Sequence, residues 1–273
     1  MLTDRFGRVH RDLRVSLTDR CNLRCTYCMP ADGLAWMPSA DLLTAAEIER
    51  VVRIGTELGI TEVRLTGGEP LIRADVVDIV ARLAALPRAP HLSVTTNALR
   101  LSALAGPLAE AGLARVNISC DTLSPESFAR LTLRDRLGDV LAGIAAAKAA
   151  GLAPIKINTV LMRGVNDHEA PALLRWALDE GLSLRFIEQM PLDPQHSWNR
   201  AMMVTREEIL DALERAGFAD LRPERAPFAL ADGVAFDQDN PLDYLNQLPF
   251  CRATALESIP LPTGSSQRPI AAH

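Results

Sequence analysis

Three closely spaced cysteines, Cys21, Cys25 and Cys28, are the residues of this chain best suited to carry out chemistry. Thiolates are soft ligands that bind zinc or iron–sulfur clusters, and a structural zinc site normally has four protein ligands in closely spaced pairs. No fourth Cys or His lies beside the triplet in the sequence. A four-iron cluster held by three thiolates keeps one iron open, and an open iron can bind and activate a second molecule. The odd number of ligands therefore indicates a catalytic cluster.

Two other interpretations of the triplet remain open at this point. Cys120 or Cys251 could complete a zinc site, or two of the thiols could form a redox-active dithiol. The flanking sequence fits an iron–sulfur site better than either alternative. Cys120 itself follows an apolar alternation, so we expect it to be a small core residue.

The composition is that of a soluble enzyme. The chain has 273 residues, of which 48% are hydrophobic, and it can bury a sizeable core. The net charge is -5, and positive and negative residues are interspersed, so the sequence shows no basic patch of the kind that binds nucleic acid. A few local Arg and Lys residues must therefore hold any anionic substrate. The sequence shows neither a signal peptide nor an apolar run long enough to cross a bilayer. Because a reducing compartment also suits an oxygen-labile cluster, we expect a cytoplasmic protein.

Short β-branched runs alternate with amphipathic helices, a pattern typical of βαβ units and a parallel α/β sheet. One helix is expected from Ala45 to Leu58, with Thr44 as its N-cap. We expect the glycines that follow the helical runs to be C-cap residues, namely Gly59, Gly112, Gly151 and Gly181. Strands are expected over residues 13–18, 62–66, 92–96, 115–119, 155–161 and 184–188.

The spacing of the cysteines, with Tyr27 just before the last, resembles the radical S-adenosylmethionine (SAM) superfamily. The resemblance implies that the open iron holds the amino and carboxylate groups of SAM and that reduction releases a 5′-deoxyadenosyl radical. It also implies a partial (β/α)6 TIM-like barrel with the site at the carboxyl ends of the strands. At the end of the second predicted strand, Gly67-Gly68-Glu69-Pro70 resembles the motif that binds the SAM amino group.

A narrower resemblance is to the GTP 3′,8-cyclase family, which makes the first intermediate of molybdenum cofactor. It covers roughly residues 4 to 217. It rests on the runs from Asp12 to Cys21, Val63 to Leu71, Val116 to Ser119, Lys156 to Val160, Arg163 to Asp167 and Arg185 to Pro191. The resemblance implies cluster ligands at Cys21, Cys25 and Cys28, SAM contacts from Tyr27, Gly68, Glu69, Ser119 and Met190, and GTP contacts from Arg14, Arg64, Thr95 and Lys156.

Elementary electrostatics makes the substrate contacts reasonable. Arg14, Arg64 and Lys156 lie at or inside predicted strands, so their side chains can converge on one polyanion such as a triphosphate. A buried cation without a partner is costly. The alternative for any one of them is an ion pair with an interior carboxylate, the candidates being Glu62, Glu69 and Asp121.

The C-terminal part departs from the family. The resemblance implies a second 4Fe–4S cluster held by a Cys-x-x-Cys pair and a further Cys, but Thr254 stands where the second Cys is expected after Cys251, and no Cys follows. The tail beyond residue 260 has the composition of a disordered segment. We therefore predict a radical SAM barrel over residues 1–217 and a degenerate or truncated extension over 218–273.

The expected function is that of a radical SAM lyase converting GTP to (8S)-3′,8-cyclo-7,8-dihydroguanosine 5′-triphosphate, impaired by loss of the second cluster site. The alternatives are a radical SAM enzyme with another substrate and a decayed paralogue that binds SAM or a nucleotide without catalysis. As partners we expect GTP and an unidentified electron donor, consider a homodimer, and expect neither nucleic acid nor a membrane.

Overall fold

A computed structural model describes residues 2–191 and 198–218. Its centre is a parallel sheet of six strands whose spatial order follows the chain. The strands are β3 (Asp12–Ser16), β4 (Glu62–Thr66), β5 (His91–Thr96), β6 (Arg115–Ser119), β7 (Ile155–Val160) and β8 (Ser183–Ile187). β8 and β3 are the two edges of the described sheet, which is therefore open. The predicted partial (β/α)6 barrel is confirmed, and each predicted strand lies within two residues of its observed bounds.

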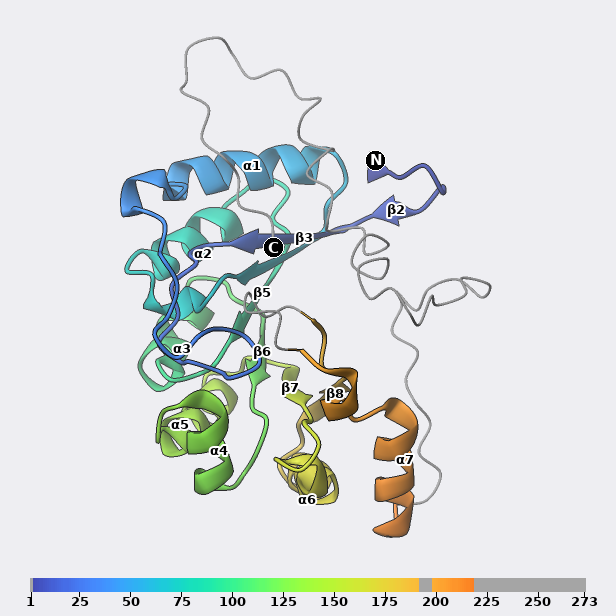
Figure 1. The fold of residues 1–273 in the computed structure, drawn as a ribbon. Coiled ribbons are helices and arrows are strands. Elements are labelled where there is room, and N and C mark those ends of the chain that lie inside the picture. The colour runs from blue at the N-terminus through green and yellow to red at the C-terminus, as the bar shows by residue number, and fades with distance from the viewer. Residues whose placement is uncertain (1, 192–197, 219–273) are drawn as a thin grey trace.

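Helices connect the strands and follow the outside of the curved sheet from α1 to α6 (Figure 1). They are α1 (Ala45–Glu57), α2 (Val76–Ala84), α3 (Leu101–Glu110), α4 (Pro125–Thr132), α5 (Leu137–Ala149), α6 (Ala170–Asp179) and α7 (Arg206–Arg215). Short 3-10 turns are η1 (Ser39–Asp41), η2 (Pro70–Ile72), η3 (Asp167–Glu169) and η4 (Arg200–Met202), and a small hairpin pairs β1 (Leu2–Thr3) with β2 (Val9–His10). No helix in the described ranges is both long and apolar enough to cross a membrane.

Local signals in the sequence set the helix ends. Thr44 caps α1 as predicted, with its side chain accepting the Glu47 N–H and the Glu47 carboxylate accepting the Thr44 N–H. Left-handed backbone ends the helices before β4, β6, β7 and β8, at the predicted residues Gly59, Gly112, Gly151 and Gly181. These stops fix where each strand begins and therefore which residues reach its carboxyl end.

The two faces of the sheet differ in chemistry. Val63 and Leu65 on β4, Ile118 on β6 and Ile157 on β7 have no exposed surface and pack against the helices in the main core. The residues that alternate with them, such as Arg64 and Thr66, are polar and half-buried. Since successive side chains of a strand point to opposite faces, the inner face of the partial barrel is polar.

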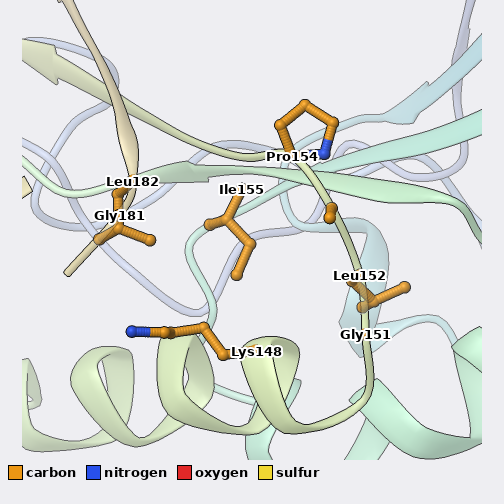
Figure 2. Close-up of a pocket in the computed structure, with 8 residues that line it drawn as sticks. Lys148, Gly151, Leu152, Pro154, Ile155, Gly181 and Leu182 are labelled. Carbon is orange, nitrogen blue, oxygen red and sulfur yellow. The ribbon is translucent and has the colours of Figure 1, made fainter.

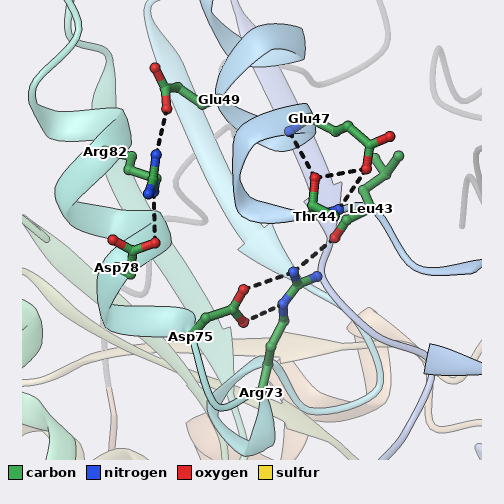
Figure 3. A network of polar contacts seen from close by, with 8 residues as sticks. All are labelled: Leu43, Thr44, Glu47, Glu49, Arg73, Asp75, Asp78 and Arg82. Carbon is green, nitrogen blue, oxygen red and sulfur yellow. Dashed lines mark hydrogen bonds and ion pairs between the residues drawn. The ribbon is translucent and has the colours of Figure 1, made fainter. Parts of the chain in front are cut away.

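One arginine, Arg73, contacts several segments near the carboxyl end of β3, and Figure 3 shows its contacts with Leu43 and Asp75. Arg73, just after η2, donates to the carbonyl oxygens of Leu17 (2.9 Å) and Leu43 (2.8 Å) and forms a bidentate ion pair with Asp75. Leu17 is buried and lies four residues before Cys21. The arginine therefore holds the strand from which the cysteine loop departs.

Candidate functional site

The cysteine loop leaves β3 and folds back against the end of α4. The backbone N–H groups of Cys28 and Met29 both donate to the Cys25 carbonyl, at 2.8 and 3.0 Å, so the last two cysteines lie on one turn. Arg24 N–H donates to Thr132 O and Thr26 N–H to Leu131 O, which ties the loop to α4. The loop is thus held by backbone hydrogen bonds on both sides of Cys25.

The three thiols lie close enough to affect one another. Burial raises the pKa of Cys25 well above its usual value, and Asp121, Cys28 and Cys21 raise it further. Burial also raises the pKa of Cys21, to which Glu69 and Cys28 contribute in the same direction. Because a metal ligand must be the thiolate, iron binding has to displace these protons.

The donor set fits a cluster better than a single metal ion. Among the described residues, no three His, Cys, Asp or Glu side chains come together closely enough to ligate one ion. A cluster is different because its thiolates bind separate iron atoms. Cys120 is 1% exposed and its Sγ contacts Thr122 O at 3.4 Å, which confirms it as a core residue. Cys251 lies outside the described residues.

The glycines at the end of β4 allow close backbone contact with the segment before Cys21. Gly67 has φ +147, and a Cβ there would overlap Thr18 O. A Cβ at Gly68 would overlap the carbonyl oxygens of Asp19 and Arg20. The Gly68 N–H donates to Thr18 O (2.7 Å) and the Glu69 N–H to Arg20 O (2.8 Å). The two glycines thus admit the polypeptide that carries the cysteines, and the SAM contact implied for Gly68 stays a prediction.

Glu69 is buried and links the ends of two strands. Its Oε1 accepts hydrogen bonds from Leu71 N–H (2.9 Å) and the Thr96 hydroxyl (2.7 Å), and its Oε2 accepts one from Asn97 N–H (2.7 Å). Burial raises the pKa of Glu69, while these hydrogen bonds oppose that rise. The carboxylate therefore fixes the carboxyl ends of β4 and β5 beside Cys21.

Tyr27 connects the cysteine loop to the other half of the sheet. Its hydroxyl donates to Asp121 Oδ2 (2.7 Å), while Asp121 Oδ1 accepts the Val160 N–H (2.8 Å). Burial raises the pKa of Asp121 to about 6. The bond spans 94 residues of sequence and brings the loop to the ends of β6 and β7.

Two more predicted SAM contacts lie at the carboxyl edge of the sheet. Ser119 is exposed at the end of β6, and Met190 follows β8 and is half-buried. The residue before Met190, Gln189, is buried and its carbonyl accepts the Trp198 indole N–H at 3.0 Å. The strand ends thus place the predicted SAM residues at one edge of the partial barrel.

The predicted substrate residues all lie on the inner face. Arg14 and Arg64 are register partners on β3 and β4. Thr95 on β5 and Lys156 on β7 are both register partners of Asn117 on β6. They therefore lie on either side of Asn117, in the row of inner-face side chains that is next to Arg115 on the side of the carboxyl edge. The structure therefore brings Arg14 next to Arg64 and Thr95 into the same row as Lys156.

Two further arginines, Arg115 and Arg185, extend the cationic surface, and we had not assigned either to the site from sequence. Burial lowers the pKa of Arg64, Asp12 raises it, and Arg14, Arg115 and Arg185 all lower it. Strand alternation was the signal for both residues, because Arg115 precedes the apolar Val116 and Arg185 lies between the apolar Leu184 and Phe186, so each points to the opposite face from these neighbours.

Interior carboxylates pair with two of these arginines. Arg64 Nη2 lies 3.5 Å from Asp12 Oδ2, and Arg115 forms an ion pair of 2.6 Å with Glu62. The ion-pair alternative thus holds in part, although Asp12 was not among the expected partners of Arg64. Within the described part of the chain, four buried polar atoms of this face lack a hydrogen-bond partner, namely Asp12 Oδ1, Arg64 Nε, Asn117 Nδ2 and Asn158 Oδ1. Such atoms normally have a partner, so they indicate a place for a polar ligand.

A separate cavity of about 220 Å³ lies at the opposite end of the sheet (Figure 2). Its lining comes from the end of α5 and the amino ends of β7 and β8, including Lys148, Ile155 and Leu182. None of the predicted site residues contributes to it.

Comparison with known proteins agrees with this geometry. The sequence profile of the radical SAM superfamily matches residues 15–177, more than half of the chain. The solved structure of a methylornithine synthase superposes with a TM-score of 0.58 at 18% identity, covering 77% of this chain and 64% of that one. At this identity the likeness shows the fold alone.

Among curated proteins, a GTP 3′,8-cyclase from Streptomyces coelicolor is 59% identical over 214 residues, covering 78% of this chain and 63% of the relative. A GTP 3′,8-cyclase from Corynebacterium glutamicum is 50% identical over 267 residues, covering 92% of this chain and 70% of the relative. The chain belongs to the radical SAM superfamily and, within it, to the GTP 3′,8-cyclase family. Membership implies a 4Fe–4S cluster and SAM. The chain spans about three fifths of the length of relatives such as the Streptomyces protein.

Proposed function

We propose that this chain is a radical SAM lyase of the GTP 3′,8-cyclase type. The cluster is assigned to Cys21, Cys25 and Cys28, whose shared loop and mutual influence on their pKa values fit a common cofactor. When bound and reduced, the cluster supplies the electron that cleaves SAM. The residues that we assign to SAM are Tyr27, Gly68, Glu69, Ser119 and Met190.

Glu69 and Tyr27 have two tasks in this proposal. Each already makes a protein hydrogen bond, Glu69 to β5 and Tyr27 to Asp121. Carboxylate oxygens accept more than one hydrogen bond each, so Glu69 can still accept a hydrogen bond from the ammonium group of SAM. Fixed side chains of this kind hold a ligand in one orientation without loss of rotamer freedom on binding.

The observation that carries the choice of GTP is the cationic inner face. Four arginines, Arg14, Arg64, Arg115 and Arg185, interact electrostatically there, and Lys156 lies on the same face. Asp12 forms an ion pair with Arg64, and Glu62 forms one with Arg115. A triphosphate supplies several negative charges and planar oxygen groups that guanidinium forks bind well. We assign Arg14, Arg64, Thr95 and Lys156 to GTP.

We further propose that cyclisation is impaired although SAM cleavage survives. The residues assigned to the first cluster and to SAM are all present, whereas Thr254 replaces the expected second Cys of the other cluster. The division into residues 1–217 and 218–273 belongs to this proposal, and the second part lies almost wholly outside the described residues. A reducing cytoplasm would suit an oxygen-labile cluster, and we propose it as the location of the protein.

The test is anaerobic turnover of the reconstituted protein with SAM and dithionite, with and without GTP, following 5′-deoxyadenosine and cyclised nucleotide by mass. Deoxyadenosine that GTP stimulates, with little or no cyclised product, is the expected result. Full cyclisation would refute the impairment, and deoxyadenosine that GTP does not affect would favour another substrate. No deoxyadenosine from protein that carries four irons would refute the enzyme assignment.

A pair of lysine variants tests the substrate site separately. Lys156→Met removes a cation of the inner face, whereas Lys148→Met removes one beside the cavity at the opposite end. We expect equilibrium dialysis to show GTP binding weakened about tenfold or more by Lys156→Met, the effect of losing one charge-assisted contact, and unchanged by Lys148→Met. Equal binding by both variants would refute the assignment of Lys156.

A further inference from the structure

Asn97 is buried at the carboxyl end of β5 and contacts both the Gly-Gly-Glu segment and the cysteine loop. Its backbone N–H donates to Glu69 Oε2 at 2.7 Å. Its side-chain Nδ2 donates to Asn22 Oδ1 at 2.7 Å and lies 3.9 Å from Cys21 Sγ in hydrogen-bond geometry. Cys21 is 76 residues earlier in the sequence, so this contact exists only in the folded chain.

The orientation of this side-chain amide is determined by its neighbours. Asn97 Oδ1 accepts the backbone N–H of Leu99 at 3.1 Å, in a turn that asparagine side chains commonly make. A flipped amide would set two donors against each other at Leu99 and two oxygens against each other at Asn22. The amide nitrogen therefore faces the loop, and one of its two N–H groups is left for Cys21 after the other is used on Asn22.

We propose that Asn97 is a positioning residue for the cluster, which holds Cys21 through its N–H groups and raises the reduction potential of the cluster bound there. Hydrogen bonds to ligating sulfur stabilise the more negatively charged, reduced state. Cys21 Sγ also accepts the Leu23 N–H at 3.5 Å, so the Asn97 contact is the second on this sulfur. Groups beyond the ligands often tune a metal site in this way.

The same side chain joins the cluster to the SAM side of the site. Glu69 fixes the Asn97 backbone, and Asn97 in turn fixes Asn22 and Cys21. Asn97 thus connects two parts of the site: the Gly-Gly-Glu segment, which we assign to the SAM amino group, and Cys21, the first cluster ligand. The inference rests on the assignment of the cluster in the proposed function, but it does not depend on GTP.

The test is the reduction potential of the reconstituted cluster, followed by electron paramagnetic resonance during a redox titration without SAM or GTP. Asn97→Ser keeps an oxygen that can accept the Leu99 N–H but is too short to reach Cys21. We expect a more negative potential, with the ratio of reduced to oxidised cluster at fixed poise falling about tenfold, as for loss of one hydrogen bond to a charged group. Asn22→Ser leaves the Asn97 contact with Cys21 in place and serves as the matched control with a smaller shift.

A wild-type potential in an Asn97→Ser protein that carries four irons would overturn the proposal. An equal shift in Asn22→Ser would also overturn it, because the effect would then belong to the loop as a whole. If Asn97→Ser does not fold, as judged by circular dichroism, Asn97→Asp decides instead, since it keeps the shape and replaces the donor by a carboxylate oxygen. Absence of any cluster signal at the triplet in the wild-type protein would refute the cluster assignment itself, and turnover without product would bear only on the choice of GTP.

Discussion

Replacing Gly68 with alanine tests whether the glycine pair serves to bring the end of β4 against the cysteine-bearing segment. An added Cβ overlaps the carbonyl oxygens of Asp19 and Arg20 and lies 2.6 Å from the Arg20 carbonyl carbon. These atoms belong to backbone, which cannot rotate away as the end of a flexible side chain would. The segments must separate, although hydrogen bonds of 2.7 and 2.8 Å hold them together.

The size of the effect follows from those contacts. Overpacking of this kind costs about 1–3 kcal/mol. Loss of the hydrogen bonds from Gly68 to Thr18 and from Glu69 to Arg20 adds about 0.5–1.5 kcal/mol each. Because separation relieves the overlap, the two costs do not fully add, and we expect a loss of about 2–4 kcal/mol in the free energy of unfolding. The displaced segment ends at Cys21, so iron incorporation should fall as well.

The assay is urea unfolding of the metal-free chain, followed by iron analysis after anaerobic reconstitution. Gly138→Ala is the matched control, because a Cβ at Gly138 in α5 meets nothing within 4 Å. The control should be neutral or more stable by up to about 1 kcal/mol, since alanine is the better helix former. If Gly68→Ala were as stable as the control and held as much iron, the contact would not be a constraint and the reasoning would be refuted.

Two other predictions concern Asp121 and Arg73, which contact the segments that carry the predicted site residues. Burial raises the Asp121 pKa to about 6 in the fold, so the folded chain binds this proton more tightly than the unfolded chain does. Its stabilising contribution is complete well below pH 4 and is lost as the pH rises through 6. The free energy of unfolding of the metal-free wild type should therefore fall by about 2 kcal/mol relative to Asp121→Asn between pH 4 and 7. A constant difference between the two proteins across that range would contradict this prediction. Arg73→Lys should cost about 2 kcal/mol in thermal or urea unfolding, because an ammonium cannot reach Leu17, Leu43 and Asp75 together. The same change at exposed Arg82 should cost less than about 0.5 kcal/mol, and equal losses would show that the contacts of Arg73 are not special.

Local patterns in the sequence were sufficient for the elements of the barrel. Alternating polar and apolar residues on β4 and β6 predicted their bounds at Glu62–Thr66 and Arg115–Ser119 without error. Thr44 and the four helix-ending glycines were predicted for the same reason, since capping depends on a few adjacent residues. The hairpin of β1 and β2 was missed because its strands have two residues each and show no period.

Local sequence patterns could not predict which side chains contact one another across the sheet. Asp12 pairs with Arg64, and Arg115 and Arg185 affect the pKa of Arg64, because the alternation of the strands brings these side chains to the same face of the sheet. Glu69 was expected to face a ligand, and the structure adds three hydrogen bonds that it makes within the protein. Its role towards SAM remains a prediction.

The sequence by itself determined the cysteine triplet, the six strands and the residue types at their carboxyl ends, because each is encoded within about ten residues of chain. The tertiary structure decided what those residues contact. The Tyr27–Asp121 bond spans 94 residues and the Asn97–Cys21 contact spans 76, and no local periodicity specifies either of them. Such contacts arise only when a parallel sheet brings the ends of distant strands to one edge, where the loop carrying the cysteines closes over them.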